Sequence, residues 1–448
     1  MADMGIRIRA RVSVFWIAPI SVALTASAAV AASSETTAQV QSADVAWLLT
    51  SSALVLMMTI PGLALFYGGL VRRKNVLSTL MQSFILVGVI SIMWVLFGYS
   101  IAFSPGNSLF GGLAWLGLNQ VSATTPYPDY SATVPHQAYM IYQCMFAVIT
   151  PALITGAIAE RMSFKGFLLF SMLWATFIYN PLAHWVWGVG GWIHTMGALD
   201  FAGGTVVHIS SGVAALAGAL TLGPRRGHPH APMVPHNLTM CVMGAALLWV
   251  GWFGFNAGSA LAANGLAVSA FVATHLGAAS ASVSWMCAEW WISGKPTVLG
   301  AASGAVAGLV AITPASGFVG PMPALAIGGV AGVLCYTAVR AKPRFGYDDA
   351  LDVVGVHAVG GIWGALATGL FASVLVNSAG ANGLFFGNPR QLMVQAIAVV
   401  ATIAFSFAGS MILLRVTAAL VEIRVSDEAE SVGLDLSEHE ETGYMLEA

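Results

Sequence analysis

Two histidines lie inside long stretches of this sequence that contain no Asp, Glu, Lys or Arg. They are His208 and His357, and each is followed four residues later by a glycine, Gly212 or Gly361. Residues four apart share one face of a helix, and small residues on such a face let two helices approach closely. The spacing would therefore bring the two imidazoles together, where each ring can donate a proton from one nitrogen and accept one at the other.

Two membrane histidines can have roles other than passing a proton between their rings. A hydrogen bond between helices is the ordinary role of a polar side chain in a membrane. Metal binding is a second option, but a third ligand and an HExxH spacing are both missing from the sequence, and its four cysteines form no CxxC pair. We therefore expect no metal and no cofactor.

Asp200 is the third candidate for chemistry. It lies just before Phe201, Gly203 and Gly204, where a helical stretch begins. This spacing is typical of a helix N-terminal cap. The carboxylate would also stabilise a cation near the outer end of that helix, and the two roles are compatible.

The elements that must position these residues are membrane-spanning helices. A helix needs about 20 apolar residues to cross a bilayer, and the charged residues divide the chain into stretches that each hold one or two such helices. We expect eleven spans, near residues 45–71, 77–103, 137–159, 164–187, 203–222, 236–256, 267–292, 297–314, 321–340, 352–376 and 391–420.

Composition and charge support an all-α, polytopic membrane protein. The chain is 58% hydrophobic and only 8% charged, whereas about a quarter of the residues in a soluble domain are charged. The formal net charge of -2 gives no basic excess that would suggest nucleic acid as a partner; the surroundings are membrane lipid. With the mature N-terminus outside, Lys and Arg fall in cytoplasmic loops except for Arg390, so the positive-inside rule favours eleven spans and a cytoplasmic C-terminus.

The N-terminal segment has the pattern of a secretory signal. Arg7, Arg9 and Arg11 precede an apolar stretch that ends in small residues, which predicts a signal peptide over residues 1–32. The stretch is long and contains Pro19, so an uncleaved additional helix is the alternative. The membrane domain would then cover residues 33–420.

The C-terminal segment 421–448 is acidic and reads as a solvated tail. Composition alone leaves open whether it is a flexible solubilising segment or an element that docks and regulates. Its acidic residues are Glu422, Asp427, Glu428, Glu430, Asp435, Glu438, Glu440, Glu441 and Glu447.

Four longer motifs are specific enough to suggest a family. They are TIPGLALFYGGL at 59–70, ALDFAGGTVVH at 198–208, GWFGFNAGS at 251–259 and DVVGVH at 352–357. In this order they resemble the Amt branch of the ammonium transporter (Amt/Rh) family, over nearly the whole chain after the signal segment. The resemblance implies two inverted five-helix repeats plus a last helix, assembled as a homotrimer with one pore per subunit.

The resemblance also implies roles for individual residues. Phe146, Trp187 and Ser259 match the outer site that recruits ammonium, and Phe146 with Phe255 matches the pair of phenylalanines that closes the pore. His208 and His357 match the pore histidines, with Asp200 as the supporting acid. Tyr142 stands where close relatives often carry phenylalanine, which places a hydroxyl near the vestibule.

We accordingly expect a channel-like transporter of the cell inner membrane, not an enzyme, that takes up ammonium and conducts ammonia while its proton moves separately. Methylammonium and carbon dioxide are alternative small substrates. The end of the tail, GLDLSEHE at 433–440, resembles the family's regulatory end, which implies a P-II-type nitrogen-signalling protein as a partner. The rival functions are an ammonium sensor that acts through such a partner, and an intramembrane enzyme using the histidines and Asp200.

Overall fold

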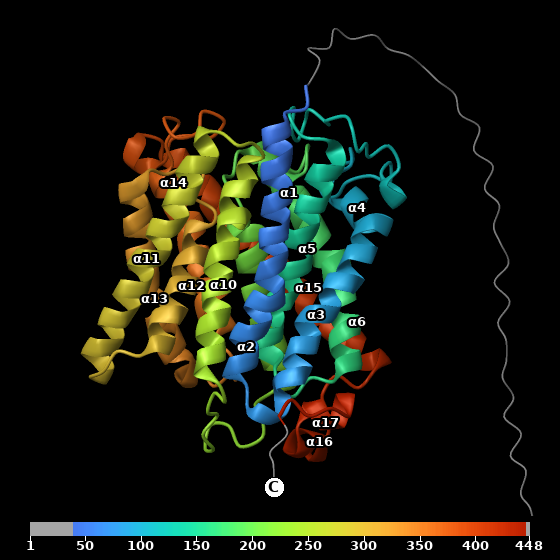
Figure 1. Ribbon diagram of the computed structural model, residues 1–448, viewed down its shortest axis with the longest axis vertical. Coiled ribbons are helices and arrows are strands. Elements are labelled where there is room, and N and C mark those ends of the chain that lie inside the picture. Colours follow the sequence, from blue (N-terminus) through green and yellow to red (C-terminus); the bar gives the residue numbers. More distant parts are fainter. Residues whose placement is uncertain (1–38, 445–448) are drawn as a thin grey trace, which may run out of the picture. The chain divides into compact units, whose positions relative to one another are not determined.

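The computed structural model describes residues 39–444, and these form a bundle of helices whose long members run in the same general direction (Figure 1). The expected signal peptide lies outside the described residues. In lipid every backbone polar group must be satisfied within the segment, which is why long apolar stretches fold as helices. Ten described helices are long and apolar enough to cross a membrane, and an eleventh apolar helix, Val298–Ile312, is shorter.

A helix lies at each of the eleven expected positions, and ten of these helices are confirmed as long and apolar enough to span; their ends differ from the expected ones by up to nine residues. In chain order they are α1–η1–α2 (Ser42–Leu70), η2–α3–η3–α4 (Arg73–Phe103), α5 (His136–Ile158), α6–η5–α7–α8 (Phe164–Met196), η6–α9 (Gly204–Leu222), α10–η7 (Leu238–Ala260), α11 (Gly265–Ser293), α12 (Val298–Ile312), α13 (Pro321–Phe345), η8–α14 (Val354–Phe371) and α15 (Pro389–Leu420).

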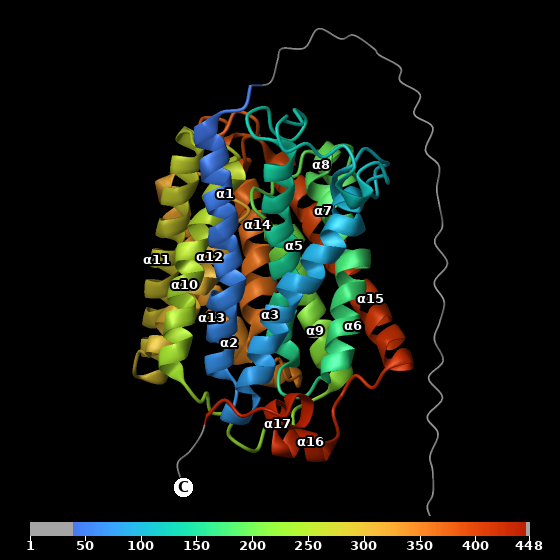
Figure 2. The same cartoon turned by 45° about the vertical axis from the view of Figure 1, so that its right-hand side comes forward.

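Burial separates central helices from peripheral ones. In α5, 89% of the most apolar stretch is buried, and in η6–α9 the share is 83%. The corresponding share is only 33% in the span that contains α3 (Val76–Met93) and in α15, whose other faces remain available to lipid. A helix that is apolar all round and also buried belongs to the centre of the bundle. The core therefore lies along α5 and α9 (Figure 2).

Two of the spans begin with a short π-helical segment, and both segments carry a histidine. They are η6 (Gly204–Ile209) with His208 and η8 (Val354–Ala358) with His357. Glycine permits their close approach: a Cβ atom on Gly212 would lie 2.3 Å from the backbone nitrogen of Ala358. Single π-helical turns are frequent at functional sites. The expected face-to-face packing through small residues is thus present.

The C-terminal tail forms two short helices, α16 (Asp427–Val432) and α17 (Leu434–His439), at one end of the bundle, here called the tail end (Figures 1 and 2). The Asp435 carboxylate accepts a hydrogen bond from Ser78 N at 2.8 Å, and that of Glu438 accepts one from Phe164 N at 2.8 Å. Both nitrogens belong to first turns of membrane helices, which have free N–H groups. The expectation of a solvated tail is therefore wrong for part of residues 427–439: Glu430 and Asp435 are buried and tail carboxylates cap helices of the bundle, whereas Asp427 and Glu428 are exposed.

A cluster of buried ion pairs closes the same end. Glu160 pairs with Arg72 and Arg225, and Arg225 also pairs with Asp348 at 2.9 Å. Burial by itself would raise the pKa of Asp348, but the Arg225 guanidinium outweighs burial and holds that pKa well below its usual range. Burial likewise opposes ionisation of Glu160, and its two arginines still lower its pKa. Loops distant in sequence are held together by these charges.

Candidate functional site

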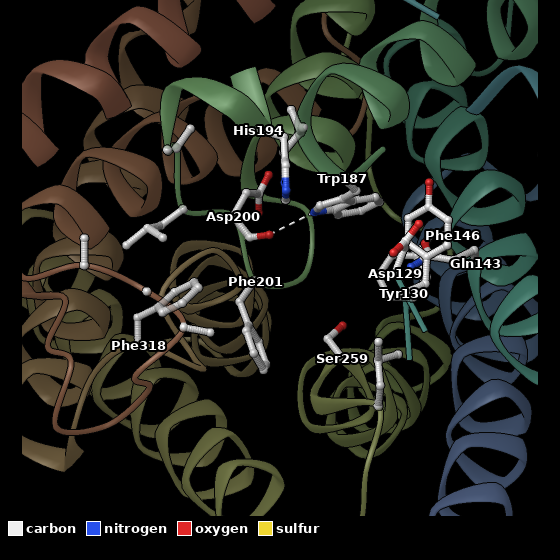
Figure 3. Close-up of a pocket in the computed structure, with 18 of the residues that line it drawn as sticks. Asp129, Tyr130, Gln143, Phe146, Trp187, His194, Asp200, Phe201, Ser259 and Phe318 are labelled. Atoms are coloured by element: carbon white, nitrogen blue, oxygen red, sulfur yellow. Dashed lines mark hydrogen bonds between the residues drawn. The ribbon is translucent and has the colours of Figure 1, made fainter. Parts of the chain in front are cut away.

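An open cavity of about 460 Å³ lies at the end of the bundle opposite the tail, and it is called the vestibule here (Figure 3). Its walls include Phe146 from α5, Trp187 from the end of α7 (Asn180–Trp187), Ser259 from η7 (Gly258–Ala260) and Asp200 from the loop before η6. The vestibule therefore collects four of the residues that the sequence singled out, from four segments of the chain.

The floor of the vestibule is made of aromatic rings. The ring of Phe146 meets that of Trp187 edge to face, with centroids 5.7 Å apart, and on its other side it stacks on Phe255 at 4.3 Å. Phe146 is 1% exposed and Phe255 is fully buried. The two stacked phenylalanines separate the vestibule from the interior of the bundle.

Tyr142 lies one helical turn before Phe146 and joins two of these elements. Its hydroxyl is buried within hydrogen-bond distance of the carbonyl oxygens of Gly254 and Phe255, at 2.9 and 2.8 Å, and of Ser259 Oγ at 3.1 Å. Ser259 Oγ also lies 2.9 Å from the Phe255 carbonyl, to which it can donate. The expected hydroxyl is near the vestibule, but it is occupied by bonds to the end of α10 (Leu238–Ala257).

Asp200 is the cap that its spacing predicts. One carboxylate oxygen accepts from Gly203 N and Gly204 N at 2.7 and 2.6 Å, and the other accepts from Thr205 N at 2.8 Å and from the Thr205 hydroxyl. Its own carbonyl oxygen accepts from Trp187 Nε1 at 2.9 Å (Figure 3). Asp200 thus fixes the start of η6, which lies four residues before His208. It also fixes the indole ring of Trp187 in the vestibule wall.

His208 and His357 are in direct contact below the phenylalanine pair. Their Nδ1 atoms are 3.2 Å apart, and their rings are nearly parallel, with an angle of 25° between the two ring planes. Only one of the two Nδ1 atoms can carry the shared proton, so the neutral rings must hold opposite tautomers. Within the described part of the chain, His208 Nε2 has no hydrogen-bond partner. This nitrogen is therefore free to form a hydrogen bond with a small molecule in an adjoining cavity.

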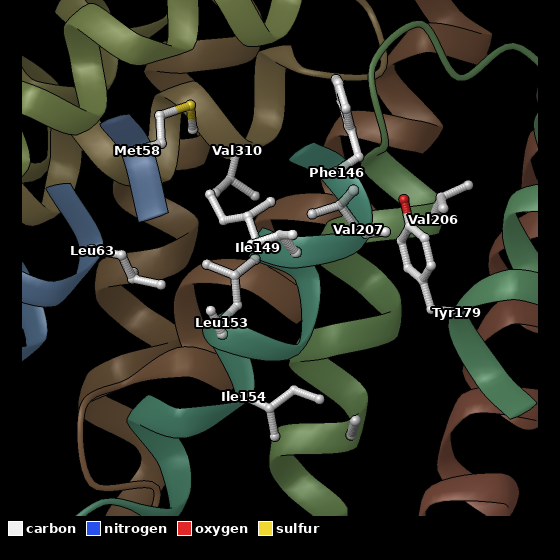
Figure 4. Close-up of a cluster of buried hydrophobic side chains, with 14 of the residues drawn as sticks. Met58, Leu63, Phe146, Ile149, Leu153, Ile154, Tyr179, Val206, Val207 and Val310 are labelled. Carbon is white, nitrogen blue, oxygen red and sulfur yellow. The ribbon is translucent and has the colours of Figure 1, made fainter. Parts of the chain in front are cut away.

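The space around the histidine pair is narrow and apolar. A cavity of about 10 Å³ touches His208, His357, Phe255 and Trp252, which is close to the smallest space that holds a water molecule. Its other walls are apolar, formed by Phe66 and non-aromatic side chains, and Figure 4 shows the cluster that includes Met58, Leu63, Ile149, Leu153 and Val207. Beyond it, His357 also borders a cavity of about 50 Å³ toward the tail end, called the inner cavity here.

Comparison with known proteins is decisive for the family. The family model described as Ammonium Transporter Family matches residues 46–444. An ammonium transporter of Bacillus subtilis is 53% identical over 405 residues, which cover 90% of this chain and 99% of the relative. The chain belongs to the ammonium transporter family. The ammonium transporter Amt1 of Archaeoglobus fulgidus is 48% identical, with 90% of this chain and 99% of the relative covered.

Solved structures agree with this ammonium transporter assignment. Mep2 of Saccharomyces cerevisiae superimposes with a TM-score of 0.81 at 36% identity, covering 87% of this chain and 89% of the other. A protein described as a sensor Amt protein superimposes with a TM-score of 0.80 at 28% identity, covering 89% and 98%. The chain is accordingly a multi-pass membrane protein of a transporter family, with the fold of that family.

One acidic cap of a histidine-bearing segment in this family member was not predicted from the sequence. Asp349 is fully buried and caps η8, because its Oδ2 atom accepts from Val354 N at 2.7 Å. Asp349 precedes His357 by the same eight positions by which Asp200 precedes His208. The paired spacing could have identified it, but the neighbouring Asp352 begins the recognisable motif and drew attention instead.

Proposed function

We propose that this protein recruits ammonium at the vestibule, removes its proton, and conducts neutral ammonia past His208 and His357 while the proton crosses by a separate relay. The observation that supports this most is the succession of two cavities joined by Phe146 and Phe255. A vestibule of about 460 Å³ gives way, below two stacked phenylalanines, to a cavity of about 10 Å³ that touches both histidines. Such a path has room for ammonia but not for a hydrated ion.

The vestibule has the chemistry to hold ammonium. Aromatic faces attract a cation by roughly 0.5–2 kcal/mol each, and the rings of Phe146 and Trp187 both border the vestibule. Ser259 is half-buried at the same wall, and its hydrogen can be directed to the Phe255 carbonyl. A lone pair of its oxygen is then available to one N–H of ammonium. Water in the vestibule can accept the remaining N–H groups.

The phenylalanine pair and the apolar wall below it oppose passage of the charged species. Moving an isolated ion from water into an apolar medium costs tens of kcal/mol in the ideal case, and ionisable groups avoid that cost by losing their charge. Ammonium can do the same by releasing a proton in the vestibule. Ammonia is small and uncharged, and it can exchange hydrogen bonds with the histidine nitrogens as it passes.

The histidine pair suits a proton relay. A proton accepted by one imidazole can be shared across the 3.2 Å contact between the Nδ1 atoms and released from the other ring. The role of Asp200 in this scheme is indirect, because its carboxylate is fully engaged in capping η6, which carries His208. Its negative charge also favours a cation in the vestibule.

Setting and partners are part of the same proposal. The protein lies in the cell inner membrane. The positions of Lys and Arg in its loops favour an orientation with the vestibule outside and the tail end in the cytoplasm. A mature protein without residues 1–32, assembled as a homotrimer, is what the family resemblance implies. The docked tail supports a regulatory role, in which a P-II-type protein binds the cytoplasmic face and acts on the pores.

An ammonium sensor is the alternative that two observations favour. The chain resembles a sensor Amt protein at 28% identity, and its tail carboxylates cap membrane helices, so a change in the bundle could reach a cytoplasmic partner. A sensor requires binding and a tail response but no flux. Transport measurements on the purified protein therefore separate the two functions.

The test is the transient current across proteoliposomes after a sudden rise in external ammonium, with a matched potassium step as control. Transport with a relayed proton gives a current for ammonium alone, and H208A or H357A reduces this current or its selectivity over potassium. A pH-sensitive dye inside the vesicles reports ammonia entry separately. Unchanged current and selectivity in both variants would rule out the relay, and absence of both current and dye response in the parent would favour the sensor.

A further inference from the structure

The two acidic caps that precede the pore histidines differ in how far they are satisfied. In Asp200 both carboxylate oxygens accept hydrogen bonds, from four backbone nitrogens and one hydroxyl. In Asp349, Oδ2 accepts from Val354 N, but Oδ1 is buried without a hydrogen-bond partner among residues 39–444. A buried polar atom without a partner costs about 1–3 kcal/mol, so its persistence calls for an explanation.

The surroundings of Asp349 leave it able to take up a proton. The charged and titratable groups around it come from α2 (Ala64–Leu70), the loop after α5, α13 and its own loop: they are Tyr67, Arg161, Lys342, Tyr347 and Asp352. Lys342 does not pair with the Asp349 carboxylate, because its ammonium lies 2.6 Å from Asp352 Oδ1 and 2.6 Å from the Asp349 backbone oxygen. Burial, only partly offset by Lys342, raises the pKa of Asp349 to about 6.

Asp349 lies behind a wall of the space into which His357 opens: it does not border this space itself, but it caps Val354, next to the bordering Val353. The inner cavity of about 50 Å³ is bordered by His357, Asp352, Val353 and Tyr67. Val353 and Val354 directly follow this part of the Asp349 loop, and Asp349 caps the π-helical segment that contains His357. A cavity of this size holds a small number of water molecules, which can carry a proton from the imidazole to the wall behind which the Asp349 carboxylate lies.

We propose that Asp349 is the proton-binding station on the tail side of the histidine pair. This inference rests on the proposed transport with a separate proton relay. An imidazolium at His357 gives its proton, through water in the inner cavity, to the Asp349 carboxylate, and His357 returns to the neutral form. The resulting carboxylic acid then releases the proton to water at the tail end and becomes a carboxylate again. Asp200, whose oxygens are all engaged, has no corresponding role.

The test compares wild-type protein with D349N and D349E in proteoliposomes, with the same pH on both sides. Asparagine can still accept from Val354 N, so the cap is kept while the titratable group is lost. D44N is the matched control, because Asp44 is also a buried acid that caps a backbone nitrogen, Ala263 N at 2.8 Å, at the other end of the bundle. Ammonium-driven current is recorded from pH 5 to 8, and ammonia entry is followed with the internal dye.

In wild-type protein we expect the current to fall as the pH is lowered through about 6, since a protonated Asp349 cannot accept. D349N should lower the current by about 100-fold, the lower end of what a positioned proton acceptor contributes, and remove its pH dependence while ammonia entry continues. D349E should restore current with a shifted midpoint, and D44N should match wild type.

Three results would overturn the inference: a wild-type profile in D349N, equal loss in D44N, or, if D349N does not fold, an unchanged midpoint in D349E. The proposed function fails in a different way. If wild-type protein itself shows neither ammonium current nor dye response, transport is absent. If it shows ammonia entry without current, the relay is absent and Asp349 has no proton to receive.

Discussion

Replacing Gly212 by alanine should separate His208 from His357 without removing either. A Cβ atom at this position would lie 2.3 Å from Ala358 N and 2.8 Å from Ala358 Cβ, both on the segment that carries His357. Ordinary contacts begin near 3.4 Å, so the two segments must move apart by about 1 Å. If this shift reaches the rings, the Nδ1 atoms now 3.2 Å apart pass beyond hydrogen-bond distance. We expect overpacking to cost about 1–3 kcal/mol of stability.

The effect on transport follows from the lost contact. A hydrogen bond to a charged imidazole contributes about 1.5–3 kcal/mol, so its loss should reduce ammonium-driven current roughly 10- to 100-fold. The assay is the current in proteoliposomes together with the thermal unfolding of the purified protein. G88A is the control, because nothing lies within 4 Å of a Cβ at that helical position. Wild-type current in a destabilised G212A protein would refute the reasoning that the histidine contact carries the proton.

Three further predictions concern the vestibule, the ion cluster and the tail. S259A should raise the half-saturating ammonium concentration about 5- to 30-fold at unchanged maximal current, in line with a lost bond of about 1–2 kcal/mol; an unchanged value in current titrations would contradict it. D348N should lower the free energy of unfolding by about 3–5 kcal/mol at pH 7, because it leaves Arg225 without this buried partner. Since the pKa of Asp348 is lowered in the folded protein, the wild-type unfolding temperature should stay constant above about pH 4 and fall below it. A wild-type unfolding temperature that does not change with pH would contradict this. Deleting residues after Val432 removes the caps from Asp435 and Glu438, so transport or its regulation should change, and a deletion protein equal to the parent in both would exclude a regulatory tail.

The membrane spans were predictable because each depends on local composition. An apolar stretch must satisfy its backbone within itself in lipid, and that requirement needs no knowledge of the neighbours. Even the short Val298–Ile312 was found, near its expected place at 297–314. Asp200 belongs with these features, since a cap is a local arrangement of a carboxylate and the next few N–H groups.

The tail shows where composition stops being sufficient. Its acidic residues predict a solvated segment, yet Glu430 and Asp435 are buried and Glu438 caps Phe164 N. Each accepts a hydrogen bond from a backbone nitrogen more than two hundred positions earlier in the chain, and Glu430 also pairs with the nearby Arg424. The number of charged residues indicates that a segment prefers water. It does not indicate that another part of the fold has unsatisfied N–H groups to which these carboxylates can bind.

The sequence by itself determined that this is an all-helical membrane protein, gave its family through long motifs, and marked His208, His357 and Asp200 as unusual groups for such surroundings. Tertiary structure decided which atoms meet: the stacking of Phe146 on Phe255, the Nδ1 contact, and the half-satisfied carboxylate of Asp349. The physical reason is that hydropathy and caps act within a few residues, whereas a pore is made by side chains from distant helices. Their contacts depend on how closely the helices pack, and packing is a property of the whole bundle.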